Sequence, residues 1–226
     1  MDFRVVTAGD ACVVVVFDER IDPVVNARCI RLADALRASG HPGVRDVIPT
    51  YHTVAVCFDP VRTDLGCLKG DIEQEAARTR GIPVGDPEPI EVPVCYGGEF
   101  GPDLAGVAAL AGCSEEEVIR LHSNEVYRVY MLGFLPGFAY MGRVNRDIAV
   151  PRLPSPRARV PAGSVGIAGV QTGVYPMDTP GGWRIIGRTS IKPFDPAGQA
   201  PFRFAPGDRV RFLPAGDHTC RDGTRV

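Results

Sequence analysis

Lysine is nearly absent from this sequence, which has only Lys69 and Lys192 among its 226 residues. Neither lysine follows a glycine-rich loop, so the chain has no phosphate-binding loop of the GxxxxGK[ST] type. No dinucleotide-binding fingerprint lies between a predicted strand and a predicted helix either. If the protein uses a nucleotide, these two common ways of holding its phosphates are excluded.

Metal-binding patterns are also missing. The four histidines, His41, His52, His122 and His218, form no HxH or HxxxH pattern, and the seven cysteines form no CxxC pair. We therefore expect no metal site, and we expect most cysteines to be reduced, buried small hydrophobes. His122 is expected to end a helix, where a positive imidazole favours the helix dipole. The sequence contains no GxSxG motif and no recognisable Ser/His/Asp set, so it identifies no catalytic residues.

Excess charge and long apolar runs are absent as well. The net charge of −2 provides no electrostatic footprint for nucleic acid or for an anionic membrane. No apolar run is long enough to span a bilayer. The first twenty residues lack the basic, apolar and small-residue order of a signal peptide. Together these absences predict a cytoplasmic protein.

The first 80 residues are predicted to form a small two-layer α/β domain. Apolar alternation predicts strands over 3–7, 11–17, 44–48 and 53–58. Asp22-Pro23 opens a predicted helix that Gly40 ends, and a second helix is predicted over about 64–80. The order β-β-α-β-β-α places the helices on one face of a mainly antiparallel sheet.

The stretch 81–89, GIPVGDPEP, has no apolar periodicity and is predicted to be a linker. It divides the chain into a first domain, 1–82, and a second domain, 83–226. In the second domain, helices are predicted over 103–111 and 114–122, with Asp103 and Ser114 as their N-caps.

Short strands separated by Gly/Pro turns fill the rest of the second domain. They are predicted at 90–95, 127–132, 164–168, 173–175, 183–187 and 209–212. Regular short strands of this kind are typical of a closed or partly closed β-barrel. The predicted fold class is therefore an α+β two-layer domain followed by a mainly-β barrel domain.

The segment from Gly133 to Thr189 carries ten glycines and seven prolines, together with arginines and aromatics at fixed places. In its loop Gly133–Phe138, aromatics alternate with turn residues; they either stack on a planar ligand or enter the core. Arg157 and Arg159 lie on a stiff proline-rich backbone, where they either bind an anion or form a solvated charge cluster.

Two further places in this segment carry polar side chains. Gln171 and Thr172 either hydrogen-bond an amide-like ligand or cap a β-turn. Trp183 lies next to Arg184 in the sequence and close to Arg188. This arrangement suits cation–π stacking or anion binding, and equally a buried anchor tryptophan beside surface arginines.

Four strings make a family resemblance visible: YGGEFGPDL (96–104), GFLPGFAYMG (133–142), RVPAGSVGIAGVQTGVYP (159–176) and PGGWRIIGRT (180–189). They closely resemble the family of 5-oxoprolinase B subunits, also labelled allophanate hydrolase subunit 1 or Kip-inhibitor-like. The likeness spans almost the whole chain, including the terminal PGDRVRF. The stretch 190–196 departs from it, because a more leucine-rich sequence is expected there.

The resemblance implies a small α/β domain followed by a cyclophilin-like barrel. It also implies a complex with a larger homologous protein, the 5-oxoprolinase C subunit, and with the A subunit. Such complexes use ATP, with Mg²⁺, to open the lactam of 5-oxo-L-proline to L-glutamate, so this chain is expected to be inactive alone. Ten candidate substrate-binding residues would line a pocket shared with the partner: Phe134, Pro136, Gly137, Arg157, Arg159, Gln171, Thr172, Tyr175, Arg184 and Arg188.

Two alternatives come with the same resemblance. Some family members are named inhibitors of a histidine kinase, so the chain would be a regulatory binding protein. Related domains form the carboxyltransferase of biotin-dependent urea carboxylase, so the chain would be part of a urea carboxylase-type or allophanate hydrolase-type enzyme. That enzyme needs a biotin carrier partner, since neither Lys69 nor Lys192 follows a methionine as a biotinyl lysine does.

Overall fold

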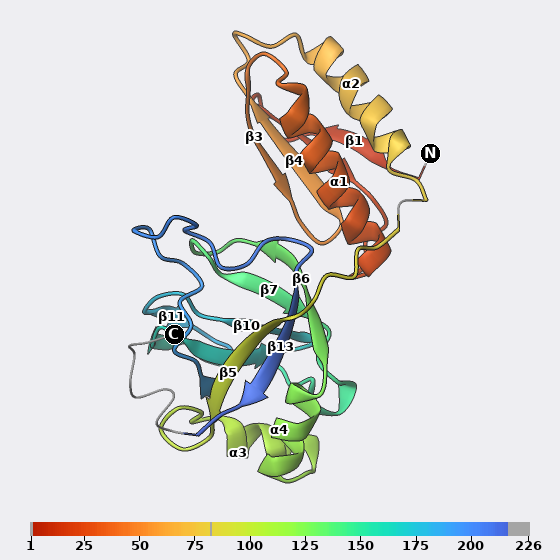
Figure 1. Ribbon diagram of the computed structural model, residues 1–226. Helices are drawn as coiled ribbons and strands as arrows, with labels where there is room; N and C mark the ends of the chain where they lie inside the picture. The colour runs from red at the N-terminus through yellow and green to blue at the C-terminus, as the bar shows by residue number, and fades with distance from the viewer. Residues whose placement is uncertain (1, 82, 217–226) are drawn as a thin grey trace. The chain divides into compact units, whose positions relative to one another are not determined.

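The computed structural model describes residues 2–81 and 83–216 of the chain. The chain falls into two compact units, Met1–Asp86 and Pro87–Val226, drawn in Figure 1. Each unit has its own apolar core. Residues 83–89 have no regular structure. The division into domains at 82/83 stays a prediction.

The first unit contains the expected β-β-α-β-β-α order. In its described residues, four strands form an antiparallel sheet in the order β1-β2-β4-β3. The strands are β1 (Arg4–Thr7), β2 (Cys12–Val16), β3 (Val44–Pro49) and β4 (Thr53–Phe58). The helices are α1 (Pro23–Ser39) and α2 (Leu65–Arg78), which contact each other (Figure 1).

Local sequence signals set the ends of these helices. The Asp22 carboxylate accepts hydrogen bonds from the backbone of Val24 and Val25, and Pro23 occupies the first turn of α1. Gly40 ends α1 in the left-handed conformation, with φ 58°. Asp64 caps α2 by accepting from the Cys67 backbone at 2.9 Å.

Alternation along the central strands separates the two faces of the sheet. Val13 and Val15 of β2 and Val54 and Val56 of β4 are fully buried in one cluster with apolar residues of α1 and α2. The residues between them are only half-buried. Because strand side chains alternate between faces, the helices cover one face and leave the other without a helix.

The second unit is a closed β-barrel. Within its described residues, seven strands follow the order β10-β7-β6-β13-β5-β12-β9, and β9 pairs with β10 to close the ring. All these pairs are antiparallel except β5 with β13. The strands are β5 (Ile90–Tyr96), β6 (Val126–Leu132), β7 (Ala139–Gly142), β9 (Ser164–Ala168), β10 (Gln171–Val174), β12 (Arg184–Arg188) and β13 (Arg209–Pro214).

Smaller elements surround the barrel. Helices α3 (Leu104–Ala111) and α4 (Glu115–Ser123) contact each other, α3 contacts β12, and α4 contacts β13 (Figure 1). A short 3-10 helix, η1 (Arg146–Ile148), contacts both. A separate two-stranded sheet joins β8 (Arg157–Val160) to β11 (Thr179–Gly181).

The sequence did not predict β7, β8 or β11. These strands have only three or four residues, and β8 and β11 are neighbours only because the intervening chain folds back. The segment after Thr189 contributes an isolated bridge between Phe194 and Phe202, and the barrel strand that follows is β13. Local alternation is too short in such segments to reveal their pairing.

The expectation that most cysteines are reduced and buried holds only in its first half. Among the described residues, Cys12, Cys29, Cys57, Cys67 and Cys113 are free thiols, but only Cys29 is buried, Cys67 is exposed and the other three are half-buried. Cys95, in β5, is disulfide-bonded. In the part of the chain that the structure describes, no helix has the length and apolar character needed to cross a membrane.

Candidate functional site

An aromatic cluster centred on Phe138 forms a second, smaller core of the barrel unit. Its other rings are Tyr140, Tyr175 and Trp183, with centroids 4.8, 5.2 and 5.3 Å from that of Phe138. The rings meet edge to face, the arrangement that aromatic quadrupoles favour. Phe138, Tyr175 and Trp183 are buried, whereas Tyr140 is half-buried. The loop aromatic Phe138 therefore belongs to the core.

The two phenols of the aromatic cluster share one cationic neighbour. Burial raises the pKa of both Tyr140 and Tyr175, and the charge of Arg152 opposes that rise at each. The Trp183 backbone N–H also donates to the Tyr175 phenol oxygen and lowers its pKa. Both phenols thus stay protonated at neutral pH, beside an exposed arginine.

Phe134 stands at the exposed edge of the aromatic cluster. Its ring lies 5.8 Å from that of Phe138 and meets it edge to face, yet Phe134 is 62% exposed. Its backbone is left-handed, with φ 68°, which is costly for a residue with a side chain. An exposed ring on a strained backbone is typical of a contact surface.

The neighbouring loop residues have different environments. Pro136 is exposed, and Gly137 is buried with φ 81°. A Cβ on Gly137 would lie 2.6 Å from the Cβ of Phe194 and 2.9 Å from the Pro193 carbonyl oxygen. Gly137 is therefore required for the loop to pack against the segment after β12, and it offers no side chain to a ligand.

Arg157 is half-buried and is held in place by Asp103. Its Nη1 and Nη2 donate to the two carboxylate oxygens at 2.9 and 2.6 Å. Asp103 is 8% exposed and also accepts from the Ile185 backbone N–H at 2.7 Å. Asp103 therefore makes no side-chain cap for α3, contrary to the role expected of an N-cap, because its carboxylate is used by Arg157 and β12.

Arg159 occupies a more open position on the same strand. Its Nε and Nη2 donate to Asp178 Oδ2 at 2.8 and 2.5 Å, and the Arg159 side chain is 77% exposed. Asp178 also accepts a hydrogen bond from the Ala162 backbone N–H, and this bond, followed by the one from Arg159, lowers the pKa of Asp178. Arg159 is therefore anchored on an exposed carboxylate that the backbone also holds in place.

Other arginine and amide candidates lie on barrel strands. Arg184 donates its Nε to the Pro151 carbonyl oxygen at 2.9 Å. Arg188 lies 5.5 Å from the centre of the Phe100 ring, a cation–π distance. Gln171 is half-buried at the start of β10, where it pairs with Ala168 and Gly142.

Thr172 lies inside the barrel and belongs to a buried hydrogen-bond chain. The Tyr96 hydroxyl lies 2.7 Å from His122 Nδ1, and His122 Nε2 lies 2.9 Å from Thr172 Oγ1. Thr172 Oγ1 donates its proton to the Gly166 carbonyl oxygen, so it accepts a hydrogen bond from His122 Nε2–H. His122 Nδ1 then carries no proton and accepts from the Tyr96 hydroxyl. The Thr172 hydroxyl is thus fully used within the barrel.

The role expected for His122, a positive charge at the end of a helix, is wrong. Its ring is fully buried and stacks on Phe212 at 4.7 Å. Burial lowers the pKa of His122 to about 3. The imidazole is therefore neutral, and it cannot stabilise the end of α4 as a positive charge.

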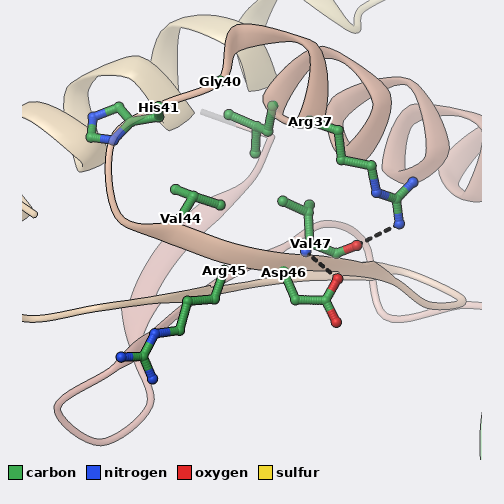
Figure 2. Close-up of a pocket in the computed structure, with 8 residues that line it drawn as sticks. Arg37, Gly40, His41, Val44, Arg45, Asp46 and Val47 are labelled. Carbon is green, nitrogen blue, oxygen red and sulfur yellow. Dashed lines mark hydrogen bonds between the residues drawn. The ribbon is translucent and has the colours of Figure 1, made fainter.

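A separate hollow lies in the first unit, between the end of α1 and β3 (Figure 2). It has a volume of about 360 Å³. At its wall, Arg37 donates to the Val47 carbonyl oxygen at 2.5 Å, and the Val47 N–H donates to Asp46 (Figure 2). None of the ten candidate residues lines this hollow. Among the described residues, no group of three or more His, Cys, Asp or Glu side chains is placed to hold a metal ion.

Sequence reasoning missed the acidic partners of the arginines. Asp103 precedes Arg157 by 54 residues, and Asp178 follows Arg159 by 19. Asp103 lies in the YGGEFGPDL string, but nothing in that string indicates an arginine partner, and Asp178 lies in none of the four strings. The only signal available was the position of Asp103 before α3, which suggested a helix cap instead. The aromatic partner Tyr140 also went unassigned, although it stands in the GFLPGFAYMG string.

Two curated relatives match nearly the whole chain, and both are named as the B subunit of 5-oxoprolinase. The relative from Bacillus subtilis is 40% identical over 221 residues, covering 93% of this chain and 92% of that protein. The relative from Escherichia coli O157:H7 is 42% identical over 214 residues, covering 94% and 96%.

Solved structures share the fold. The chain called TTHA0988 is 40% identical with a TM-score of 0.81; the match covers 91% of this chain but only 40% of that one. The Kluyveromyces lactis urea carboxylase is 17% identical with a TM-score of 0.78, covering 97% of this chain and 22% of that one, which shows the fold alone. The sequence model of the carboxyltransferase domain, subdomain C and D, matches residues 3–204. The chain belongs to this family.

Proposed function

We propose that this chain is the B subunit of an ATP-dependent 5-oxoprolinase complex, which opens the lactam of 5-oxo-L-proline to L-glutamate. The observation that carries the proposal is the near-complete match to two relatives named as 5-oxoprolinase B subunits, at 40% and 42% identity. The proposed partners are the homologous C subunit and the A subunit. ATP with Mg²⁺ is assigned to the complex, and no metal ligand is assigned to this chain.

The chemistry defines what the complex must provide. Amide resonance makes a lactam carbonyl a poor electrophile, and transfer of the ATP γ-phosphoryl group to the lactam oxygen would activate it. Such a site needs cationic groups for the phosphates and fixed hydrogen-bond donors for the ring carboxylate. Arginine supplies both through its planar set of donors.

Arg159 is the best-placed arginine of this chain for that role. Asp178 takes its Nε and Nη2, which leaves Nη1 outside this ion pair, and the side chain is 77% exposed. Val160, the next residue of β8, is buried with the aromatic cluster. We assign Arg159 to binding an anionic group, and the more enclosed Arg157 to holding β8 and β12 in place through Asp103.

Phe134 supplies the apolar side of the same proposed site. Its ring is exposed, and its neighbour Phe138 anchors the loop in the aromatic cluster. Because Phe134 combines a left-handed backbone with a ring that is 62% exposed, we assign the ring to a contact made in the complex. This chain would then provide one half of a site, and its partner protein would provide the other half.

The test is assembly followed by omission. The chain is co-expressed with the candidate C and A subunits, the complex is purified, and 5-oxoproline-dependent release of phosphate is measured. A stable complex whose turnover disappears when this chain is omitted supports the proposal. Full turnover by the other two proteins alone would refute the assignment of this chain to the enzyme.

A further inference from the structure

Two free thiols face each other across the centre of the first unit's sheet. Cys12 of β2 and Cys57 of β4 are direct register partners, and both are half-buried free cysteines. Val13 and Val56, the next pair along, point into the helix-covered core. Since side chains alternate along a strand, Cys12 and Cys57 lie together on the face that the helices leave uncovered.

The hydrogen-bond pattern places the two cysteines close together. The Phe58 N–H donates to the Ala11 carbonyl oxygen at 2.9 Å, so Ala11 and Phe58 form a hydrogen-bonded pair. The adjacent pair, Cys12 with Cys57, is therefore of the non-hydrogen-bonded kind, whose Cα atoms lie about 4.5 Å apart. That separation falls within the range of roughly 4.4–6.8 Å that a disulfide spans.

The surroundings of Cys12 favour its neutral form. Burial, followed by the charge of the neighbouring Cys57, raises the pKa of Cys12. Cys12 is therefore a neutral thiol at pH 7, and it reacts more slowly than a catalytic cysteine with a depressed pKa. On β3, Asp46 pairs with Cys57 from the other side, so the row across the sheet ends in a carboxylate.

We propose that Cys12 and Cys57 are an oxidative modification site, at which a small disulfide such as oxidised glutathione oxidises the two thiols to one disulfide that reversibly joins β2 to β4. With oxidised glutathione, one cysteine thiolate attacks the glutathione disulfide and releases one glutathione thiolate. The second cysteine then attacks the mixed disulfide, loses its proton to solvent and releases the second glutathione. Two protein thiols are oxidised to one disulfide, and one glutathione disulfide is reduced to two thiols.

The bond would close a loop of chain that contains α1 and β3. Such a link restricts the unfolded chain and therefore stabilises the unit that carries it. Since the reduced pair already lies in register, the link needs no rearrangement of the ladder. The site is independent of the proposed enzyme function, because none of the ten candidate residues lies on β2 or β4.

The test uses the full chain, millimolar oxidised glutathione and peptide mapping by mass spectrometry. We expect a Cys12–Cys57 cross-link with the loss of two hydrogens, removed by dithiothreitol. Circular dichroism is expected to show a rise of several degrees in the melting temperature of the oxidised protein. In Cys12→Ser, Cys57 should instead hold a glutathione adduct, with no rise in melting temperature.

Cys67→Ser is the matched control, because Cys67 is an exposed free cysteine on α2. This variant should form the cross-link, and oxidation should raise its melting temperature by as much as that of the wild-type chain. Cys57→Ala provides a second variant if the serine substitution perturbs the sheet. If glutathione modifies Cys67 while Cys12 and Cys57 stay free or carry separate adducts, the proposed site is wrong.

Discussion

Asp103 holds Arg157 through both of its carboxylate oxygens and at the same time accepts a backbone hydrogen bond from Ile185. This single carboxylate therefore ties the start of α3 to β8 and to β12. The sequence makes Arg157 a candidate ligand-binding residue, and in the structure its guanidinium helps to join β8 to α3 and to the barrel strand β12. The exposed Arg159 on the same strand has no comparable structural duty.

The first prediction concerns that ion pair. Arg157→Ala leaves a nearly buried carboxylate without its partner, so we expect a loss of about 2–4 kcal/mol in the free energy of unfolding. Denaturant titration followed by Trp183 fluorescence reports the barrel unit directly, since this is the chain's only tryptophan. The control Arg159→Ala breaks an exposed ion pair and should cost less than about 1 kcal/mol. Equal losses in the two variants would contradict the assigned roles.

The second prediction concerns Arg159 in the assembled enzyme. Arg159→Ala should lower kcat/KM for 5-oxoproline roughly 10- to 150-fold, the effect of losing a charged hydrogen bond of about 1.5–3 kcal/mol. Arg4→Ala is the control, because Arg4 also forms an exposed ion pair, with Glu19 in the first unit. Unchanged turnover in Arg159→Ala, with intact assembly, would remove Arg159 from the site.

The third prediction separates the ring of Phe134 from its backbone. A left-handed backbone costs a side-chain-bearing residue roughly 1–2 kcal/mol, and glycine avoids that cost. Phe134→Gly should therefore be about 1 kcal/mol more stable than Phe134→Ala in denaturant titration. Both variants lack the ring, so both should lose the same fraction of complex activity. If Phe134→Gly instead kept more activity than Phe134→Ala, in step with its greater stability, the ring would have no contact in the complex.

The fourth prediction concerns pH and His122. The unfolded imidazole takes up a proton as the pH falls below about 6.5, whereas the folded one does so only near pH 3. The contribution of this group to stability is therefore present above pH 6.5 and declines as the pH falls, by about 1.4 kcal/mol per pH unit. In denaturant titrations between about pH 7.5 and 4.5, the free energy of unfolding of His122→Gln should fall less steeply with decreasing pH than that of the wild-type chain. The difference in slope should correspond to one proton, the one that the unfolded His122 takes up. Parallel curves for the two proteins would place the neutral histidine in doubt.

The fifth prediction compares two glycines with positive φ. A Cβ on Gly137 would meet the Cβ of Phe194 at 2.6 Å, whereas a Cβ on Gly169 has open space around it. Gly169→Ala should cost only the backbone strain of roughly 1–2 kcal/mol. Gly137→Ala adds a steric clash of about 1–3 kcal/mol. A denaturant midpoint that falls equally in both variants would contradict the close packing at Gly137.

Local features of the fold follow from the sequence, whereas long-range pairings do not. Asp22, Pro23 and Gly40 bound α1 because capping acts within one helical turn. Alternation along β2 and β4 identified the central strands for the same local reason. The pairing of β8 with β11, and of Asp103 with Arg157, joins segments that are distant in the sequence. No spacing rule connects residues that are 54 positions apart.

The same distinction explains the candidate site. The GFLPGF loop was recognised from its composition, and Phe134 is exposed there as a contact residue requires. Thr172 could not be separated from its neighbour Gln171 by sequence, because only the barrel reveals that its hydroxyl bonds with His122. Charge, likewise, does not reveal that Arg157 of β8 is enclosed and Arg159 is exposed.

The most direct test of the central claim is ATP hydrolysis by the purified complex of this chain with the C and A subunits, measured in parallel with 5-oxoproline, urea and allophanate. We predict phosphate release that depends on 5-oxoproline, matched one to one by L-glutamate, and no stimulation by urea or allophanate. A complex that ignores 5-oxoproline, or that turns over urea or allophanate instead, would contradict the proposed function.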